Sequence, residues 1–288
     1  TMKKTLSLAL ALTMALSLAA CGNSGGSSSS APADASGSSS QANSSTSSSS
    51  ANTESDLAYV QNKGTLVVGI TEFEPMDYQN TDGEWIGFDA DLAKEFAESL
   101  GVTVEFQLID WDNKVMELDG KTIDVVWNGM TLTEDVLAAM ECSQPYLINQ
   151  QVVVVPADVA EDYQTEESLA DLNFAVEIGS AGCEVAQANG YSYTEVADQA
   201  TALLEVASGT ADAAIIDSLM AGAMIGEGTS YADMTSTVAL TSEEYGVGFR
   251  KGSDLAATLN EFLSGKYADG SIQTLAETYG VQDALVQE

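Results

Sequence analysis

The sequence predicts an α/β protein built from two similar halves. Apolar runs typical of strands alternate with runs that have the spacing of amphipathic helices, and this alternation occurs twice along the chain. Two segments also repeat one another, since "ELDGKTIDVVWN" (117–128) and "EVASGTADAAIID" (205–217) each run from a helix through Gly and Asp into a strand that ends at a polar residue. Strand, helix, strand, helix, strand is the order that favours a mostly parallel sheet flanked by helices.

The first 56 residues are expected to lie outside this fold. Lys3 and Lys4 precede an apolar run from Leu6 to Leu18, and "LAAC" ends at Cys21, which predicts a secretory signal over residues 2–20. Leu18 to Cys21 resemble the bacterial lipobox, whose cysteine is lipidated; the alternative is a buried Leu-Ala helix. Residues 21–56 are mainly Ser, Gly, Ala, Asn and Thr, so we expect the lipidated cysteine to be followed by a flexible tether.

The first half of the body begins with a strand over Thr65–Ile70, "TLVVGI". Phe88, Leu92, Phe96 and Leu100 recur every fourth residue before Gly101, which predicts a helix with a glycine stop. Three further elements are expected, namely a strand over 102–108, a short helix over 114–118 and a strand over 123–127.

The second half begins after "QVVVV" (151–155). Strands are expected over 174–178 and 213–216, and helices over 183–188 and 199–208. Asn128, Gly129 and Asp217 then fall at the carboxyl ends of strands, where open α/β sheets bind ligands. If the two halves face each other, residues 128–131 and Asp217 meet across one cleft.

Composition excludes several functions. The chain has 9 basic and 44 acidic residues and a formal net charge of −35, which argues against binding nucleic acid. It has no histidine, so imidazole catalysis and His-based metal sites are excluded. No DxDxDG loop is present, and we predict neither a metal nor a cofactor. Cys142 and Cys183 are expected as free thiols, although two cysteines outside the cell can also pair.

Several segments in order resemble the bacterial extracellular solute-binding proteins that deliver polar amino acids to ABC transporters. They are "GTLVVGI", "GFDADLAKEFAESLGVTVEF", "KTIDVVWNGMTLT", "SQPY", "SLADL", "VEIGSAG", "ADAAIIDS" and "YGVGFRKGSDL". The resemblance implies a two-lobed periplasmic-binding-protein-like fold of type II, which closes on its ligand around two hinge strands. Lobe 1 would comprise residues 57–150 and 245–288, and lobe 2 residues 151–244.

The resemblance also implies site residues. Asp217 would hold the α-amino group of an amino acid, Thr131 and Gly129 would contact the head group beside Asn128, and Phe73 would stack on the side chain. Simpler roles are open for each: a helix cap for Asp217, a turn hydroxyl for Thr131 and core packing for Phe73.

The chain departs from the family pattern at the carboxylate end of the ligand. The clamping arginine is replaced by Val136 and a threonine contact by Ala181. Hydrogen bonds to charged groups contribute about 1.5–3 kcal/mol, so the loss of the arginine alone predicts about ten- to hundredfold weaker binding unless other donors replace it. The candidates are amides from Ser180 to Cys183, the Thr131 and Thr133 hydroxyls, and Arg250, the single arginine. A place on the surface of a returning strand is the favoured alternative for Arg250.

A cationic or amine ligand is the alternative, with Glu72, Glu74 and Asp77 adding negative charge to a cleft in which we see no obvious cation. Trp85 and Trp111 are expected to pack under loops, and stacking on a ligand is the alternative for either. The function expected first is a monomeric, membrane-anchored receptor that presents a small polar solute to an ABC permease and its ATPase. A tethered sensor and, less favoured, a dehydratase-like enzyme remain alternatives.

Overall fold

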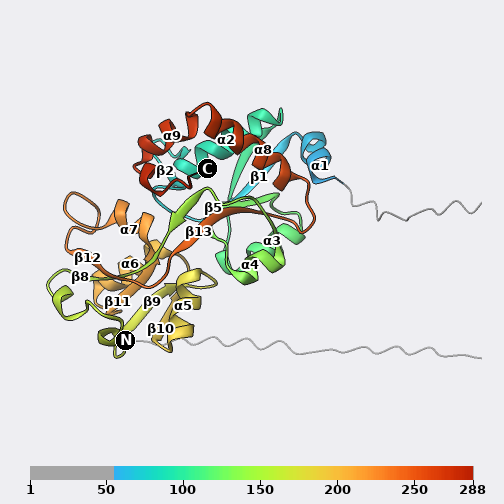
Figure 1. Cartoon of the computed structure of the whole chain (residues 1–288). Coiled ribbons are helices and arrows are strands. Elements are labelled where there is room, and N and C mark those ends of the chain that lie inside the picture. The colour runs from blue at the N-terminus through green and yellow to red at the C-terminus, as the bar shows by residue number, and fades with distance from the viewer. Residues whose placement is uncertain (1–54, 288) are drawn as a thin grey trace, which may run out of the picture. The chain divides into compact units, whose positions relative to one another are not determined.

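The computed structural model describes residues 55–287, which form two large β-sheets with helices packed against them and a separate two-stranded sheet (Figure 1). The expected signal sequence, Cys21 and nearly all of the tether lie outside the described residues. Between residues 55 and 287 no helix combines the length and the apolar character needed to cross a membrane.

The first sheet is mixed, because parallel strands make up only one side of it. β1 (Thr65–Ile70) lies between β4 (Thr103–Leu108) and β5 (Val125–Thr131), and both pair with it in parallel. β13 (Glu243–Phe249) then runs antiparallel to β5. The short strands β6 (Glu141–Cys142) and β7 (Leu147–Asn149) pair antiparallel with β13.

The second sheet repeats this order. β9 (Asn173–Glu177) lies between β10 (Ser192–Val196) and β11 (Ala213–Asp217), again in parallel. β8 (Gln151–Pro156) runs antiparallel to β11, and β12 (Met234–Ala239) is antiparallel to β8. The repeat between residues 117–128 and 205–217 is therefore a repeat of topology: β5 and β11 hold equivalent places.

Alternation along the strands gives each sheet two buried faces. In β11, Ala214 and Ile216 share a cluster with residues of α6 (Gln199–Ser208), whereas Ala213 and Ile215 share one with residues of α5 (Ala181–Asn189). Successive strand side chains point to opposite faces, so an uninterrupted apolar run fits a strand covered on both sides.

The helices of the first sheet follow the same logic. α2 (Phe88–Ser99) places Phe88, Leu92 and Phe96 in the core beneath β1 and β5. On the other face lie η1 (Trp111–Asn113), α3 (Lys114–Asp119) and α4 (Glu134–Ala139). The Thr133 hydroxyl caps α4 by accepting a hydrogen bond from the Val136 amide at 3.3 Å.

The chain passes from the first sheet to the second at Gln150, between β7 and β8, and returns through residues 240–242. The remaining elements are α1 (Asp56–Lys63), β2 (Tyr78–Gln79), β3 (Trp85–Ile86), η2 (Ala160–Asp162), η3 (Glu166–Leu169), α7 (Ser218–Met224), α8 (Leu255–Ala268), α9 (Ser271–Tyr279) and η4 (Gln282–Ala284).

Candidate ligand-binding site

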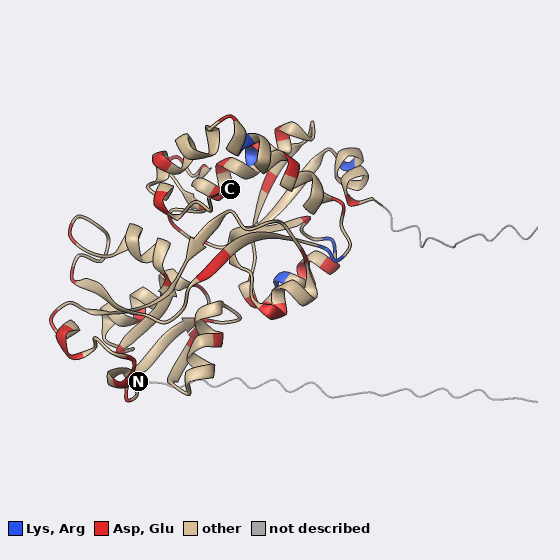
Figure 2. Cartoon of the chain, in the orientation of Figure 1, with Lys and Arg blue, Asp and Glu red and all other residues tan. Residues whose placement is uncertain are grey.

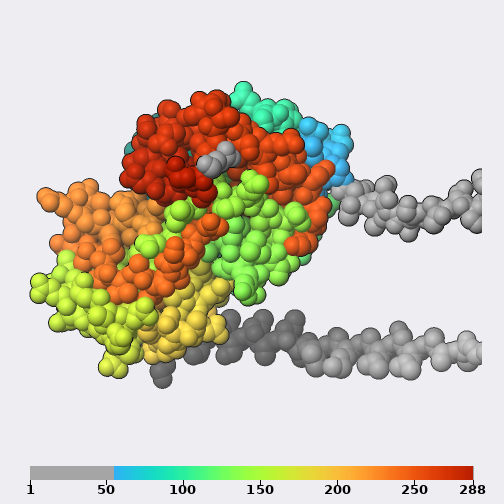
Figure 3. All heavy atoms as spheres, viewed as in Figure 1, coloured from blue at the N-terminus to red at the C-terminus, as the bar shows by residue number. Residues whose placement is uncertain are grey.

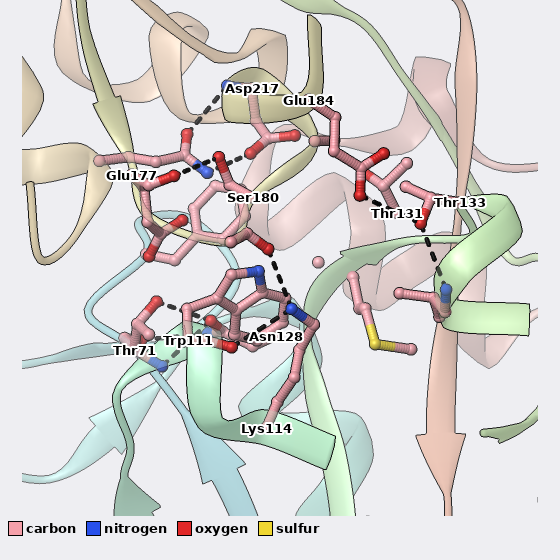
Figure 4. Close-up of a pocket in the computed structure, with 17 residues that line it drawn as sticks. Thr71, Trp111, Lys114, Asn128, Thr131, Thr133, Glu177, Ser180, Glu184 and Asp217 are labelled. Atoms are coloured by element: carbon pink, nitrogen blue, oxygen red, sulfur yellow. Dashed lines mark hydrogen bonds between the residues drawn. The ribbon is translucent and has the colours of Figure 1, made fainter. Parts of the chain in front are cut away.

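A pocket lies where the carboxyl ends of strands from both sheets come together (Figure 4). The first sheet contributes the ends of β1 and β5 with η1, α3 and α4, and the second contributes the ends of β9 and β11 with α5 and α6. The lining residues are Thr71, Phe73, Trp111, Lys114, Asn128, Gly129, Met130, Thr131, Thr133, Val136, Glu177, Gly179, Ser180, Ala181, Glu184, Gln199 and Asp217.

Asp217 is the most heavily bonded carboxylate of the pocket. It occupies the N-cap position of α7, but its side chain makes no capping bond there. Instead the carboxylate accepts hydrogen bonds from the side-chain amides of Asn149, Gln151 (2.8 Å) and Gln199. Burial, and secondarily the charge of Glu243, raises the pKa of Asp217 to about 7. An ammonium ion placed here would favour the ionised form.

Glu177 is a second buried carboxylate, at the end of the strand next to that of Asp217. It is 3% exposed, and its Oε1 has no hydrogen-bond partner among the described residues. Burial is the main reason that the pKa of Glu177 rises to about 8, and the charge of Asp217 adds to the shift.

Lys114 supplies the cation that the sequence did not reveal. The residue is only 8% exposed. Its ammonium donates to the carbonyls of Trp111 (3.2 Å) and Gly179 (3.0 Å) and lies 4.8 Å from the centre of the Trp111 ring. Among residues 55–287, no carboxylate lies within 4.0 Å of it. Burial lowers the pKa of Lys114, and nearby Glu177 opposes the shift. The pocket therefore holds a buried ammonium without an ion-pair partner.

Two aromatic side chains form the apolar part of the lining. Phe73 packs edge-on against Tyr245, with ring centroids 6.4 Å apart, and covers Gly129. Gly129 has φ +53°, and a Cβ there would lie 2.6 Å from the Phe73 ring, so a larger residue cannot fit without displacing it. Trp111, for which both packing under a loop and stacking on a ligand were open, is buried in a hydrophobic cluster and also lines the pocket.

The Asn128 side chain is fully occupied by neighbouring groups. Its Oδ1 accepts from the Thr71 amide (3.0 Å) and hydroxyl (2.7 Å), while its Nδ2 donates to the Thr71 carbonyl (3.0 Å) and to Asp77 (2.8 Å). Asp89 accepts from the Gly129 amide at 2.7 Å. These bonds hold the end of β5 in place beside the pocket.

The hydroxyls considered as replacements for the arginine already have acceptors. Thr131 donates to Glu243 at 2.8 Å, and Thr133 donates to Glu184 at 3.5 Å. Ser180 caps α5, accepting from the Cys183 amide at 3.2 Å, so that amide is occupied as well. Val136 and Ala181 line the pocket and contribute only apolar atoms from their side chains.

Arg250 is not part of the pocket, so its suggested role as a replacement clamp is wrong. Its guanidinium is buried against Asp56 (3.0 Å) and donates to the carbonyls of Leu118 (3.2 Å) and Ile123 (2.9 Å). Of the loop acids, Asp77 is buried beneath Asn128, and Glu72 and Glu74 do not line the pocket. Trp85 does not line the pocket and packs against Phe106.

Four residues that line the pocket were not predicted from the sequence: Lys114, Glu177, Gln199 and Glu184. A signal existed for Glu177, because it ends the apolar run "FAV" just as Asp217 ends "AAII". Lys114 follows Trp111 by three residues, which places both on one side of a helical turn. Its burial depends on the hydrogen bond to Gly179, which follows a strand of the second sheet, and the local sequence around Lys114 cannot predict that contact.

The cysteines and acids offer no metal site among the described residues. Cys142 lies on β6 and Cys183 on α5, and both are free thiols in the structure, as expected. Figure 2 shows acidic residues distributed over the elements of both sheets, with few basic ones.

The cavity itself has a volume of about 20 Å³, room for little more than a water molecule. It adjoins an open groove of about 690 Å³ that shares Thr131, Thr133, Ala181 and Glu184 with it. In the space-filling view, the yellow segment that includes α5 meets the green segment that includes α4 (Figure 3). Pockets for small ligands typically measure about 300–1,000 Å³, so a larger ligand needs these segments to separate.

The fold and site define a class: α/β proteins with a charged pocket between the strand ends of two sheets of like topology. The model of the bacterial extracellular solute-binding proteins, family 3, matches residues 66–282, and the chain belongs to this family.

Relatives agree with this assignment. The L-cystine-binding protein TcyJ of Escherichia coli K12 is 29% identical over 230 residues, covering 78% of this chain and 86% of TcyJ. An ABC uptake transporter substrate-binding protein from Streptococcus pneumoniae with bound histidine superimposes with a TM-score of 0.74 at 27% identity, covering 81% and 99% of the two chains. The ancestral amino acid-binding protein AncCDT-1, described as a precursor of cyclohexadienyl dehydratase, gives a TM-score of 0.71 at 32% identity and covers 78% and 99%.

Proposed function

We propose that the protein is the extracytoplasmic substrate-binding component of an ABC importer for an amino acid, anchored to the membrane by lipid on Cys21. The observation that carries the proposal is a pocket with a buried, unpaired ammonium on one side and buried carboxylates on the other. Figure 4 shows Lys114 and Trp111 together, with Asp217 and Glu177 across the pocket from them. Free amino acids carry the complementary pair of charges.

In this arrangement the α-ammonium group lies at Asp217, where charge-assisted hydrogen bonds are strong. The α-carboxylate lies at Lys114, which replaces the arginine lost at Val136. The ligand side chain lies against Phe73 and Trp111. Asn128, Gly129 and Thr131 then act mainly by shaping the end of β5, and Ser180 and Ala181 by shaping the start of α5.

Ligand entry requires the two lobes to open, since the cavity holds little more than a water. We propose lobe 1 as residues 57–150 and 245–288, and lobe 2 as 151–244, with motion at Gln150 and residues 240–242. Lys114 and Gly179 lie on opposite lobes and are joined by a 3.0 Å hydrogen bond, so closing brings the ligand's carboxylate partner into place.

The test is calorimetric titration of residues 55–288 and of Asp217→Asn with the common amino acids. At least one should bind the wild type, and Asp217→Asn should weaken it about ten- to hundredfold, because a hydrogen bond to a charged group contributes about 1.5–3 kcal/mol. Absence of any amino-acid binding would refute the proposal.

The membrane anchor and the partners need separate tests. With Cys21→Ser in the full chain, the protein should leave the membrane fraction and appear in the medium. If the protein serves a permease and its ATPase, uptake of the bound amino acid should also fall in the Cys21→Ser variant. If the protein is a sensor, the substitution should leave uptake unchanged.

A second candidate is an enzyme, because the raised pKa of Glu177 and the lowered pKa of Lys114 are shifts found at acid–base sites. We favour binding, since the relatives are mainly binding proteins. Incubating the bound amino acid with equimolar protein and recording its NMR spectrum separates the two: a receptor returns the ligand unchanged.

A further inference from the structure

One oxygen of Glu177 has no role in the fold. Glu177 Oε1 is buried, lines the pocket and accepts no hydrogen bond from the described residues. A buried polar atom left unpaired costs about 1–3 kcal/mol, so such atoms are rare unless something else supplies their partner.

The hydrogen bonds of the neighbouring donors go to atoms other than Glu177 Oε1. Gln199 Nε2 donates to Asp217, and the backbone amide of Asp217 donates back to Gln199 Oε1 at 2.9 Å. The Lys114 ammonium donates hydrogen bonds to two carbonyls and lies more than 4.0 Å from the Glu177 carboxylate. Glu177 Oε1 is therefore free to accept a hydrogen bond from a bound ligand.

The charges that line the pocket point to the nature of this donor. Three acids, Glu177, Glu184 and Asp217, face one cation, Lys114. The two charges of a simple amino acid engage Asp217 and Lys114 and leave Glu177 Oε1 without a partner. A ligand with an additional positive group donates to Oε1 and supplies that partner.

Resting on the proposed function, we propose that Glu177 is a specificity-determining residue that selects amino acids with a second cationic group on the side chain. The solute then carries a net positive charge. Amino acids with neutral or acidic side chains bring no cation to Glu177 and leave it buried and unpaired.

Matched ligand pairs test this inference: L-arginine against L-citrulline, L-lysine against L-norleucine, and L-ornithine against L-norvaline. Each is titrated into the wild type and into Glu177→Gln at 150 mM salt. The wild type should bind the cationic member of at least one pair about ten- to hundredfold more tightly. In Glu177→Gln this preference should collapse, with the neutral member's affinity unchanged or increased.

The matched control is Glu167→Gln, which removes the same charge from an exposed residue outside the pocket and should leave the ratio within about twofold. Neutral members that bind the wild type as tightly as cationic ones overturn the inference but leave the receptor intact. So does an unchanged ratio in Glu177→Gln. If no free amino acid binds the wild type, the proposed function fails as well. The wild-type ratio is decisive even if Glu177→Gln does not fold.

Discussion

Lys114→Met is the substitution whose consequences follow most directly from the structure. Methionine keeps the length of the side chain but removes the charge and both hydrogen bonds, to Trp111 (3.2 Å) and Gly179 (3.0 Å). Two such bonds contribute on the order of 2 kcal/mol to folding. Against this loss, the protein no longer has to bury an unpaired ammonium, which is itself unfavourable.

These two effects on folding oppose one another, so we expect a stability change of at most about 1–2 kcal/mol. For a folded body of this size, each kcal/mol shifts the melting temperature by about 2–4 °C. The effect on binding is not offset. A desolvated contact between the ligand carboxylate and Lys114 contributes about 1.5–3 kcal/mol, which is about ten- to 150-fold in Kd.

The assay compares an amino acid with its decarboxylated amine by calorimetry. Lys114→Met should weaken the amino acid to that extent and leave the amine's affinity unchanged or improved. Lys251→Met is the matched control, because this exposed lysine also donates to two carbonyls, of Leu137 (2.9 Å) and Met140 (3.0 Å), outside the pocket. The reasoning is refuted if Lys114→Met binds the amino acid like wild type, or if it weakens amino acid and amine equally.

Three further outcomes are expected. The folded pKa of Asp217 is about 7 against 3.8 for the free side chain, so its contribution to stability is full below about pH 4 and is lost as pH rises through 7. Ligand affinity should rise as pH increases through 7, because the ligand's ammonium prefers the ionised acid. Stability and affinity measured from pH 5 to 8 check both effects, and Asp217→Asn should flatten both pH profiles. Arg250→Met leaves the buried Asp56 unpaired and should lower the free energy of unfolding by about 3–5 kcal/mol in urea, with unchanged Kd in the folded fraction. In Gly179→Ala, a Cβ would lie 2.9 Å from the Asp112 Cα at φ +69°, so binding should weaken at least tenfold, and an unaltered Kd would contradict close approach of the lobes there.

Local pattern was enough to predict most of the fold. The strand at 65–70 and the helix at 199–208 have the predicted bounds, because each is a short apolar or amphipathic run between glycines or caps. A returning strand was expected near Arg250, but the antiparallel pairing of β13 with β5 was not predicted. The glycines of β13, Gly246 and Gly248, are more typical of a loop than of a strand. Each is required here because the side chains that pack against it, from β5 and nearby, leave no room for a Cβ atom.

The site was predictable only in part. Residues at strand ends, such as Asp217, are visible in sequence because a polar residue interrupts an apolar run. The roles of Lys114 and Arg250 could not be predicted from the sequence, because they depend on which distant segment covers each side chain. Arg250 pairs with Asp56, 194 positions away, and Lys114 bonds to Gly179, 65 positions away. Charge sign was evident from composition, but the position of the single cation in the pocket depends on tertiary contacts.

The pocket is also joined to the strands on which the lobes would move. Asn149 and Gln151 flank the crossing at Gln150, and each donates both to Asp217 and to Glu243. Glu243 begins β13, beside the return crossing, and its charge helps to raise the pKa of Asp217. An ionised Asp217 without a cation repels Glu243 across these two amides, whereas a bound ammonium cancels that repulsion. Because the same amides hold both carboxylates, the ammonium group of the proposed ligand and closure of the proposed lobes would stabilise each other.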